Sequence, residues 1–297
     1  MGFFDHLLRD IRSVIDRDGG QNAIPPLDGA LSPNDRLDTA VPIGEPLPGV
    51  DDVIAAGDGA IYVSAGRQVL KLSGSDFATR AIVAEFEDDA GGLALHPDGR
   101  LLVCVAGRGL AAIDPAKPAP RWLESAGGSA LVGLLSVTAA PDGRIYAVEG
   151  SAGRRPSEWR HDLMEKRANG RLISCGAGLD NPQVLLRDLP YPYGVMVSAD
   201  GNSLWLTESW AHGLSRFALG GSGLGPRETV AANMPGYPAR LHPDGHGGFL
   251  LGMFARRTHL IEFVLKEDDF REEMMATMPP EYWVAPALVG GSEIGRA

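Results

Sequence analysis

A motif of roughly 40–45 residues repeats along most of this chain, and it limits the possible folds more than any other feature. Each unit has an apolar strand, an Asp-Gly type of turn, a strand rich in β-branched or aromatic residues, a glycine-bearing turn and a third strand. The first turns fall at Asp58, Asp98, Asp142, Asp200 and His246, at intervals of 40, 44, 58 and 46 residues; in the fifth unit His246 is preferred over Asp244. Short strands repeated at this period are typical of β-propeller blades. We therefore predict an all-β propeller with five recognisable blades.

The repeat divides the chain into three parts. Residues 50–265 hold the blades, and the last unit ends in THLIEFVL. Residues 1–49 hold an N-terminal amphipathic helix followed by an extended lead-in, and 266–297 form a C-terminal helical and irregular segment. An insert from Arg154 to Asn169 lengthens the third interval and predicts a helical excursion over one face. Several closures of the ring stay open: five blades alone, a missing sixth blade, an N-terminal strand, or a partner segment or second chain.

Composition narrows the class of partner. The net charge of −11 and the pI near 5.1 argue against nucleic acid, which requires clustered Lys and Arg. No apolar run reaches the roughly 18 residues of a transmembrane helix, and the start of the chain lacks a secretory pattern. Cys104 and Cys175 both lie in strand-like runs, which favours buried free thiols. We expect a cytoplasmic protein with a small-molecule ligand, no nucleic-acid partner and no transmembrane segment.

Propeller geometry predicts where a ligand would bind. The first strand of each blade lines the central channel, so equivalent positions near its start meet at one spot. Counting back from each first turn selects two positions per unit. They are Asp51, Gly91, Leu135, Tyr193 and Ala239, followed by Asp52, Gly92, Ser136, Gly194 and Arg240.

The stretch from Asp142 to Phe254 resembles the strictosidine synthase-like family, within the wider group that includes gluconolactonases. The resemblance is carried by DGRIYAVEGS, NGRLISCG, VLLRDLPYPYGVMVSADGNSLWLTES, and NMPGYPARL followed by GGFLLGMF. It implies a propeller of the six-bladed type with its ligand at the mouth of the axis. The sixth blade expected for the family would follow residue 297.

The resemblance also bears on cofactors. In the gluconolactonase branch it implies a divalent cation held by a Glu, an Asn and an Asp. Here these positions read Asp51, Tyr193 and Ala239, and only Asp51 keeps a ligand type that Ca²⁺ prefers. We therefore expect no cofactor, with a divalent cation such as Ca²⁺ at Asp51 as the alternative. In plant strictosidine synthases the resemblance implies a glutamate of the last blade, and no residue of this chain takes that role.

Polar and aromatic side chains at the mouth define the candidate site. Asp51, Tyr193 and Arg240 are the catalytic candidates, because a carboxylate, a phenol and a guanidinium can hold and polarise a polar organic ligand. The candidates for substrate binding are Asp52, Ser136 and, reaching over from the insert, Trp159 and His161. The family resemblance implies that such a site belongs to a lactone or ester hydrolase, or a lyase, acting on a small organic metabolite. The alternative is a non-catalytic propeller that binds a metabolite or a protein.

Overall fold

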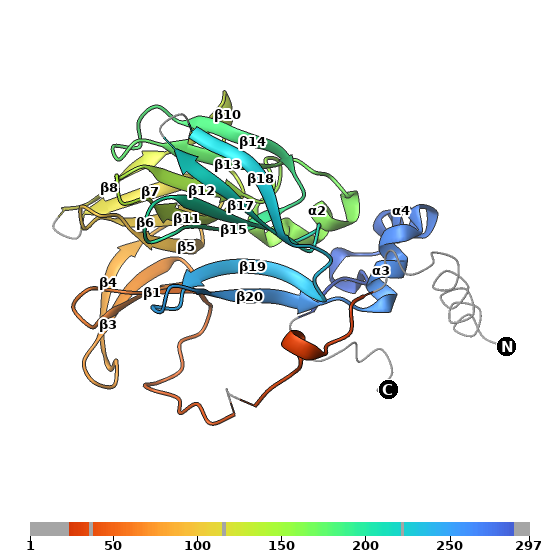
Figure 1. The fold of residues 1–297 in the computed structure, drawn as a ribbon, viewed down its shortest axis with the longest axis horizontal. Helices are drawn as coiled ribbons and strands as arrows, with labels where there is room; N and C mark the ends of the chain where they lie inside the picture. The colour runs from red at the N-terminus through yellow and green to blue at the C-terminus, as the bar shows by residue number, and fades with distance from the viewer. Residues whose placement is uncertain (1–23, 36–37, 115–116, 221–222, 288–297) are drawn as a thin grey trace.

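The computed structural model describes residues 24–35, 38–114, 117–220 and 223–287. The helix predicted at the start of the chain lies outside these ranges. Within them, short antiparallel strands build the body of the molecule, and the longer helices α2, α3 and α4 gather at one side (Figure 1). The prediction of an all-β propeller is confirmed.

Four four-stranded antiparallel sheets form the first four blades, and each keeps its strands in sequence order. The first blade contains β1 (Val50–Ala55), β2 (Ile61–Ala65), β3 (Gln68–Ser73) and β4 (Thr79–Glu85). The second contains β5 (Ala90–Leu95), β6 (Leu101–Val105), β7 (Gly109–Asp114) and β8 (Lys117–Leu123). The third contains β11 (Leu134–Ala139), β12 (Ile145–Glu149), β13 (Gly170–Cys175) and β14 (Gln183–Leu189). The fourth contains β15 (Pro192–Val197), β16 (Ser203–Glu208), β17 (Gly213–Gly220) and β18 (Gly223–Ala231). A short hairpin of β9 (Ser125–Ala126) and β10 (Ser129–Ala130) precedes the third blade.

The fifth unit differs from the prediction. It forms a two-stranded sheet of β19 (Gly236–Pro243) and β20 (Phe249–Arg256). The prediction of a third strand in this unit is wrong, because the stretch folds as the helix α3 (His259–Lys266). Thr258 caps the helix by accepting a hydrogen bond from the Ile261 N–H, and a capped helix start competes with strand pairing. The helix predicted next is confirmed as α4 (Asp268–Thr277).

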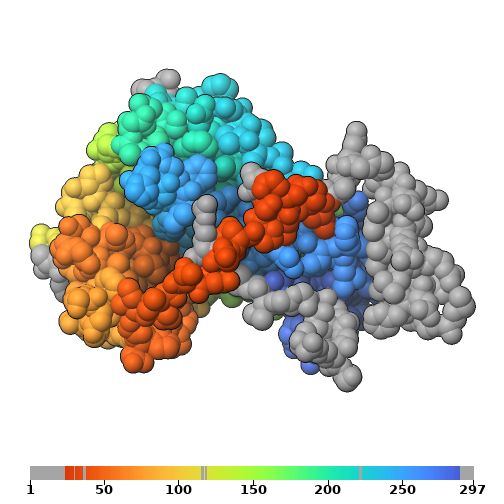
Figure 2. Space-filling view, turned by 60° about the horizontal axis from the view of Figure 1, so that its bottom comes forward, coloured from red at the N-terminus to blue at the C-terminus, as the bar shows by residue number. Residues whose placement is uncertain are grey.

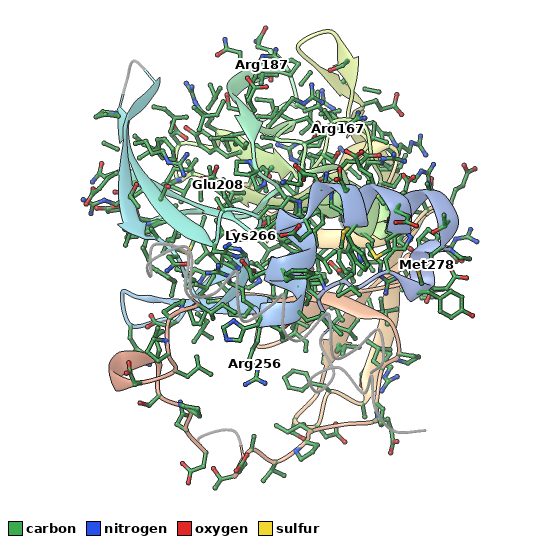
Figure 3. The ribbon with its side chains drawn as sticks, turned by 90° about the vertical axis from the view of Figure 1, so that its right-hand side faces the viewer. Arg167, Arg187, Glu208, Arg256, Lys266 and Met278 are labelled. Atoms are coloured by element: carbon green, nitrogen blue, oxygen red, sulfur yellow. The ribbon has the colours of Figure 1, made fainter. Side chains whose placement is uncertain are left out.

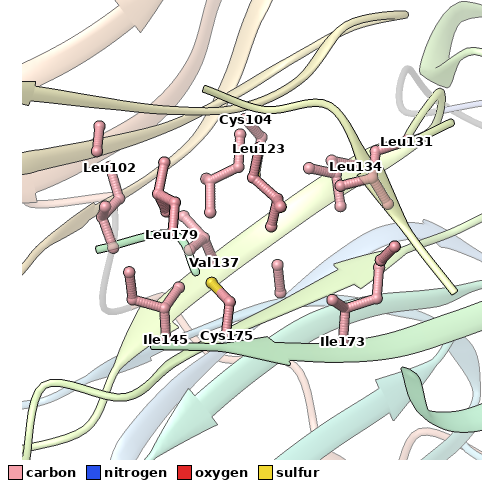
Figure 4. Packing of buried hydrophobic residues seen from close by; sticks show 14 residues of the cluster. Leu102, Cys104, Leu123, Leu131, Leu134, Val137, Ile145, Ile173, Cys175 and Leu179 are labelled. Atoms are coloured by element: carbon pink, nitrogen blue, oxygen red, sulfur yellow. The ribbon is translucent and has the colours of Figure 1, made fainter. Parts of the chain in front are cut away.

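Apolar clusters between successive blades form the core. Alternate residues of a strand face opposite sides of its sheet, so a central strand packs against both neighbouring blades. On β6, Leu101 and Val103 face the first blade, whereas Leu102 and Cys104 face the third. Figure 4 shows Leu102 and Cys104 in the cluster that also contains Cys175. Both cysteines are buried free thiols, as predicted.

The first strands approach one another closely at the axis. β5 packs against β1 and β11, and β15 packs against β11 and β19. A Cβ atom at Gly92 would lie 2.5 Å from the carbonyl oxygen of Leu135, and one at Gly194 would lie 2.4 Å from that of Ala239. A side chain at Gly92 or Gly194 would therefore collide with the main chain of the next blade, so both positions require glycine.

The side of the fifth blade facing the first differs from the other blade junctions. At this junction the side chains of Val53, Ile82 and Leu250 remain 44%, 60% and 66% exposed. The residues next to Val53 and Leu250 in their strands point the other way and pack toward the second and the fourth blade, respectively. The lead-in, which includes a 3₁₀ turn η1 (Gly29–Leu31), crosses from the C-terminal helices to the first blade (Figure 2). Its Leu47 packs on the first blade. How the ring is completed between these two blades stays a prediction.

A helical layer covers one side of the propeller. The insert forms η2 (Pro156–Glu158) and α2 (Trp159–Glu165), which confirms the predicted excursion. Leu163 and Met164 of α2 pack with Phe263 of α3, Met274 of α4 and Trp283, which follows η3 (Pro280–Tyr282). Figure 3 shows α3 and α4 in front of the blades. None of the helices in the described part of the chain is long and apolar enough to cross a membrane.

Candidate functional site

A cavity of about 460 Å³ lies where the first strands converge. Each of the five blades contributes a lining residue from the register positions selected in the sequence. These residues are Asp51 on β1, Gly91 on β5, Leu135 on β11, Tyr193 on β15 and Arg240 on β19. The repeat thus brings together residues that are far apart in the chain.

Arg240 connects three blades at this cavity. Its Nη2 donates to Oδ1 of Asp51 and, at 2.8 Å, to the carbonyl oxygen of Leu135. Its Nη1 donates to the carbonyl oxygen of Asp51 at 2.8 Å. Burial alone would lower the pKa of Arg240, but Asp51, Tyr193 and Asp52 outweigh it and raise that pKa. The guanidinium is therefore a permanent cation, with only 12% of the side chain exposed.

Tyr193 lies beside this cation. Its ring centroid is 5.5 Å from Cζ of Arg240, which is within the range of a cation–π contact. Burial raises the pKa of the Tyr193 phenol, and the charge of Arg240 opposes only part of that rise. The phenol is therefore protonated at neutral pH and can donate a hydrogen bond to a ligand.

Asp52 and Ser136 were predicted to contact the ligand, but the structure places neither in the cavity lining. Both are buried, because alternate positions of a first strand point between blades rather than into the channel. Asp52 accepts from the Leu93 N–H at 2.8 Å and lies 3.0 Å from Nε2 of His242. Burial would raise the pKa of Asp52, but His242 and Arg240 outweigh it and lower that pKa. Asp52 thus joins the first blade to the second and the fifth.

The insert contributes one predicted residue to the cavity and not the other. Trp159 lines it and meets Phe254 of β20 edge to face, with ring centroids 4.8 Å apart. His161, two positions along, packs against Trp283 at 4.8 Å and does not line the cavity. Positions two apart on a helix point in different directions, so α2 cannot direct both rings inward.

Aromatic residues that the sequence reasoning missed complete the wall. Tyr191 and Trp210 both line the cavity and stack with centroids 4.3 Å apart. The indole N–H of Trp210 donates to Oδ1 of Asp162 at 2.8 Å. Burial of Asp162 raises the pKa of its carboxyl, and the hydrogen bonds from Ser151 and Trp210 offset part of the rise. The aromatic residues of the sequences YPY (191–193) and ESW (208–210) could have indicated this wall.

The donors at this site do not match a bound divalent cation. Asp51 is engaged by Arg240, and neither Tyr193 nor Ala239 supplies the carboxylate or amide oxygen that the family resemblance implies. Among the described residues, no group of three or more His, Cys, Asp or Glu side chains is arranged to hold a metal ion. The residues present therefore do not fit the expected cation.

The fold and the cavity define a β-propeller with a pocket at its axis. No protein-family model matches the chain. The chain is 28% identical over 248 residues to the human adipocyte plasma membrane-associated protein, covering 77% of this chain and 59% of that protein. It is 28% identical over 199 residues to strictosidine synthase-like 6 of Arabidopsis thaliana, covering 67% of this chain and 52% of that protein. These comparisons confirm the resemblance, because strictosidine synthase-like 6 is among the homologues of the chain. The chain spans only about three fifths or less of the length of these two relatives.

Solved structures agree on the fold. A gluconolactonase from Xanthomonas campestris superposes with a TM-score of 0.59 at 19% identity, covering 70% of this chain and 71% of the other. The chain is therefore built like the gluconolactonase-type propellers, and its chemistry has to be argued from its own residues.

Proposed function

We propose that the chain is a hydrolase that cleaves a small organic ester or lactone in the axial cavity. The observation that carries the proposal is the convergence of Asp51, Tyr193 and Arg240 on one aromatic-walled space. In acyl transfer to water, a carboxylate can act as the general base, and a protonated phenol and a fixed cation can stabilise the oxyanion. The cavity's volume of about 460 Å³ suits a small organic molecule.

In the proposed reaction, Asp51 accepts a proton from water while the water oxygen bonds to the carbonyl carbon. The charge that develops on the carbonyl oxygen is stabilised by the O–H of Tyr193 and by the Arg240 cation. The bond from carbon to the leaving oxygen then breaks, and Asp51 returns its proton to that oxygen. One water is consumed, and an acid and an alcohol are formed; a lactone gives both in one molecule.

Binding without catalysis is the second candidate function, and one observation favours it. The carboxylate of Asp51 already accepts a hydrogen bond from Arg240, and this contact competes with proton transfer from water. The two functions predict different results when the phenol of Tyr193 is removed, because only the hydrolase requires a donor at the carbonyl oxygen.

The test measures hydrolysis of phenyl acetate and δ-valerolactone at constant pH. Tyr193→Phe keeps the ring and removes the donor, so kcat should fall about 100-fold while KM changes little. Tyr282→Phe is the matched control, because Tyr282 is exposed and lies outside the cavity. If the wild type hydrolyses these compounds no faster than Tyr193→Phe does, and either compound raises its unfolding temperature, the result would support binding without catalysis.

A further inference from the structure

The guanidinium of Arg240 occupies a cage of oxygen atoms. Two carbonyl oxygens, from Asp51 and Leu135, each accept from it at 2.8 Å. Oδ1 of Asp51 also accepts from it, and Oδ2 of Asp52 lies 3.7 Å from its Nε. Two carboxylates and two main-chain carbonyls therefore surround one cation at the axis.

Oxygens of these two types can also bind a hard divalent cation, but only where no side-chain cation occupies them. Calcium takes carboxylate and carbonyl oxygens in flexible geometry. A guanidinium satisfies the same oxygens because its five N–H donors are spread over a plane. The cation of this cage is therefore supplied by the chain itself.

A second arginine at the same cavity shows what makes the cage distinct. Arg155 pairs with Asp88 at 2.6 Å, but 46% of its side chain is exposed, compared with 12% for Arg240. An ion pair exposed to water contributes little and leaves no buried charge when it is broken. Removal of Arg240 would instead take away the cation that Asp51 shares with the buried Asp52, and would leave Asp52 with His242 as its remaining ion-pair partner.

We propose that Arg240 is a built-in axial cation that keeps divalent metal out of the cage, and that removing its guanidinium turns the cage into a calcium site. Gly91 lies beside these groups in the cavity lining, and a Cβ built there would be 3.4 Å from Oδ1 of Asp51 and 3.7 Å from Nη2 of Arg240, both ordinary contact distances. The glycine therefore keeps β5 from crowding the cage.

The test compares thermal unfolding and calcium calorimetry for the wild type, Arg240→Ala, Arg240→Gln and the control Arg155→Ala. Calcium should leave the wild type and Arg155→Ala unchanged. Arg240→Ala should unfold about 5 °C or more below the wild type without calcium, because its carboxylates repel. With about 10 mM calcium and a Kd on the order of 1 mM, its midpoint should rise by about 3–5 °C.

Arg240→Gln covers the case in which the alanine variant does not fold, because its amide can still donate to Leu135. The same rise with calcium is expected for it. Calcium binding by the wild type that disappears in Asp51→Asn would overturn the proposal, and so would a folded Arg240→Gln that calcium does not stabilise. These readouts measure cation binding, so they do not depend on whether the cavity hydrolyses an ester.

Discussion

Alanine substitution should destabilise the protein strongly at one of two adjacent glycines of β5 and little at the other. Gly91 faces the axial cavity, and Gly92 faces the third blade. Neither glycine has a positive φ angle, so the backbone at both positions can accept alanine. The difference between Gly91→Ala and Gly92→Ala therefore isolates the contact that each added methyl group makes.

The magnitude follows from the distances. At Gly92 a Cβ would lie 2.5 Å from the carbonyl oxygen of Leu135 and 2.9 Å from Cα of Ser136, both main-chain atoms. Main chain in a packed sheet cannot turn aside as a side chain can, so the first strands must separate. Forcing such a group into a packed core typically costs about 1–3 kcal/mol or more, and we expect about 3 kcal/mol for Gly92→Ala. At about 2–4 °C for each kcal/mol, its midpoint should fall by roughly 6–12 °C.

Urea and thermal unfolding of both variants, followed by circular dichroism, would measure the difference. Gly91→Ala should stay within about 1 kcal/mol of the wild type, because the chain loses less entropy on folding and meets only ordinary contacts. It should still weaken ligand binding by narrowing the cavity. Equal stability of the two variants would refute the packing of β5 against β11.

Two further predictions concern buried titratable groups. Burial raises the pKa of Asp162 in the native protein above its ordinary value of 3.8. Between these two pKa values the native protein keeps a proton that the unfolded chain has released, so stability should fall as the pH rises from 3.8 through the native pKa. Asp162→Asn should remove this decline and be the more stable protein at pH 7, as measured by urea unfolding from pH 4 to 8; an unchanged slope would contradict it. Burial also raises the pKa of the Cys175 thiol to about 12 and that of Cys104 further. Neither should react with Ellman's reagent at pH 8 until guanidinium is added, and rapid reaction of the native protein would contradict their burial.

The blades and the position of the cavity could be predicted because both depend on the local repeat. Turn residues and alternating apolar positions recur in every unit, and a shared register places Asp51, Tyr193 and Arg240 at the axis. The fifth unit departs from the repeat at the apolar run after Thr258, which is compatible with either a strand or a helix and forms α3 behind the Thr258 cap.

Side-chain direction was harder to predict than position. Asp52 and Ser136 lie at the predicted register but point between blades, and His161 lies on the far side of α2 from Trp159. The hydrogen-bond partners of Arg240 lie on β1 and β11, so they depend on how three strands meet and could not be predicted from a local sequence pattern. The cytoplasmic location stays a prediction.

The central claim is that residues remote in sequence act together at the propeller axis. A double-mutant cycle between Asp51 and Arg240, which are 189 positions apart, tests it most directly. Asp51→Ala, Arg240→Ala and the double variant would be compared by urea unfolding. The hydrogen-bonded ion pair predicts a coupling energy of at least about 1 kcal/mol. Effects that add to within about 0.3 kcal/mol would contradict the convergence of these two strands.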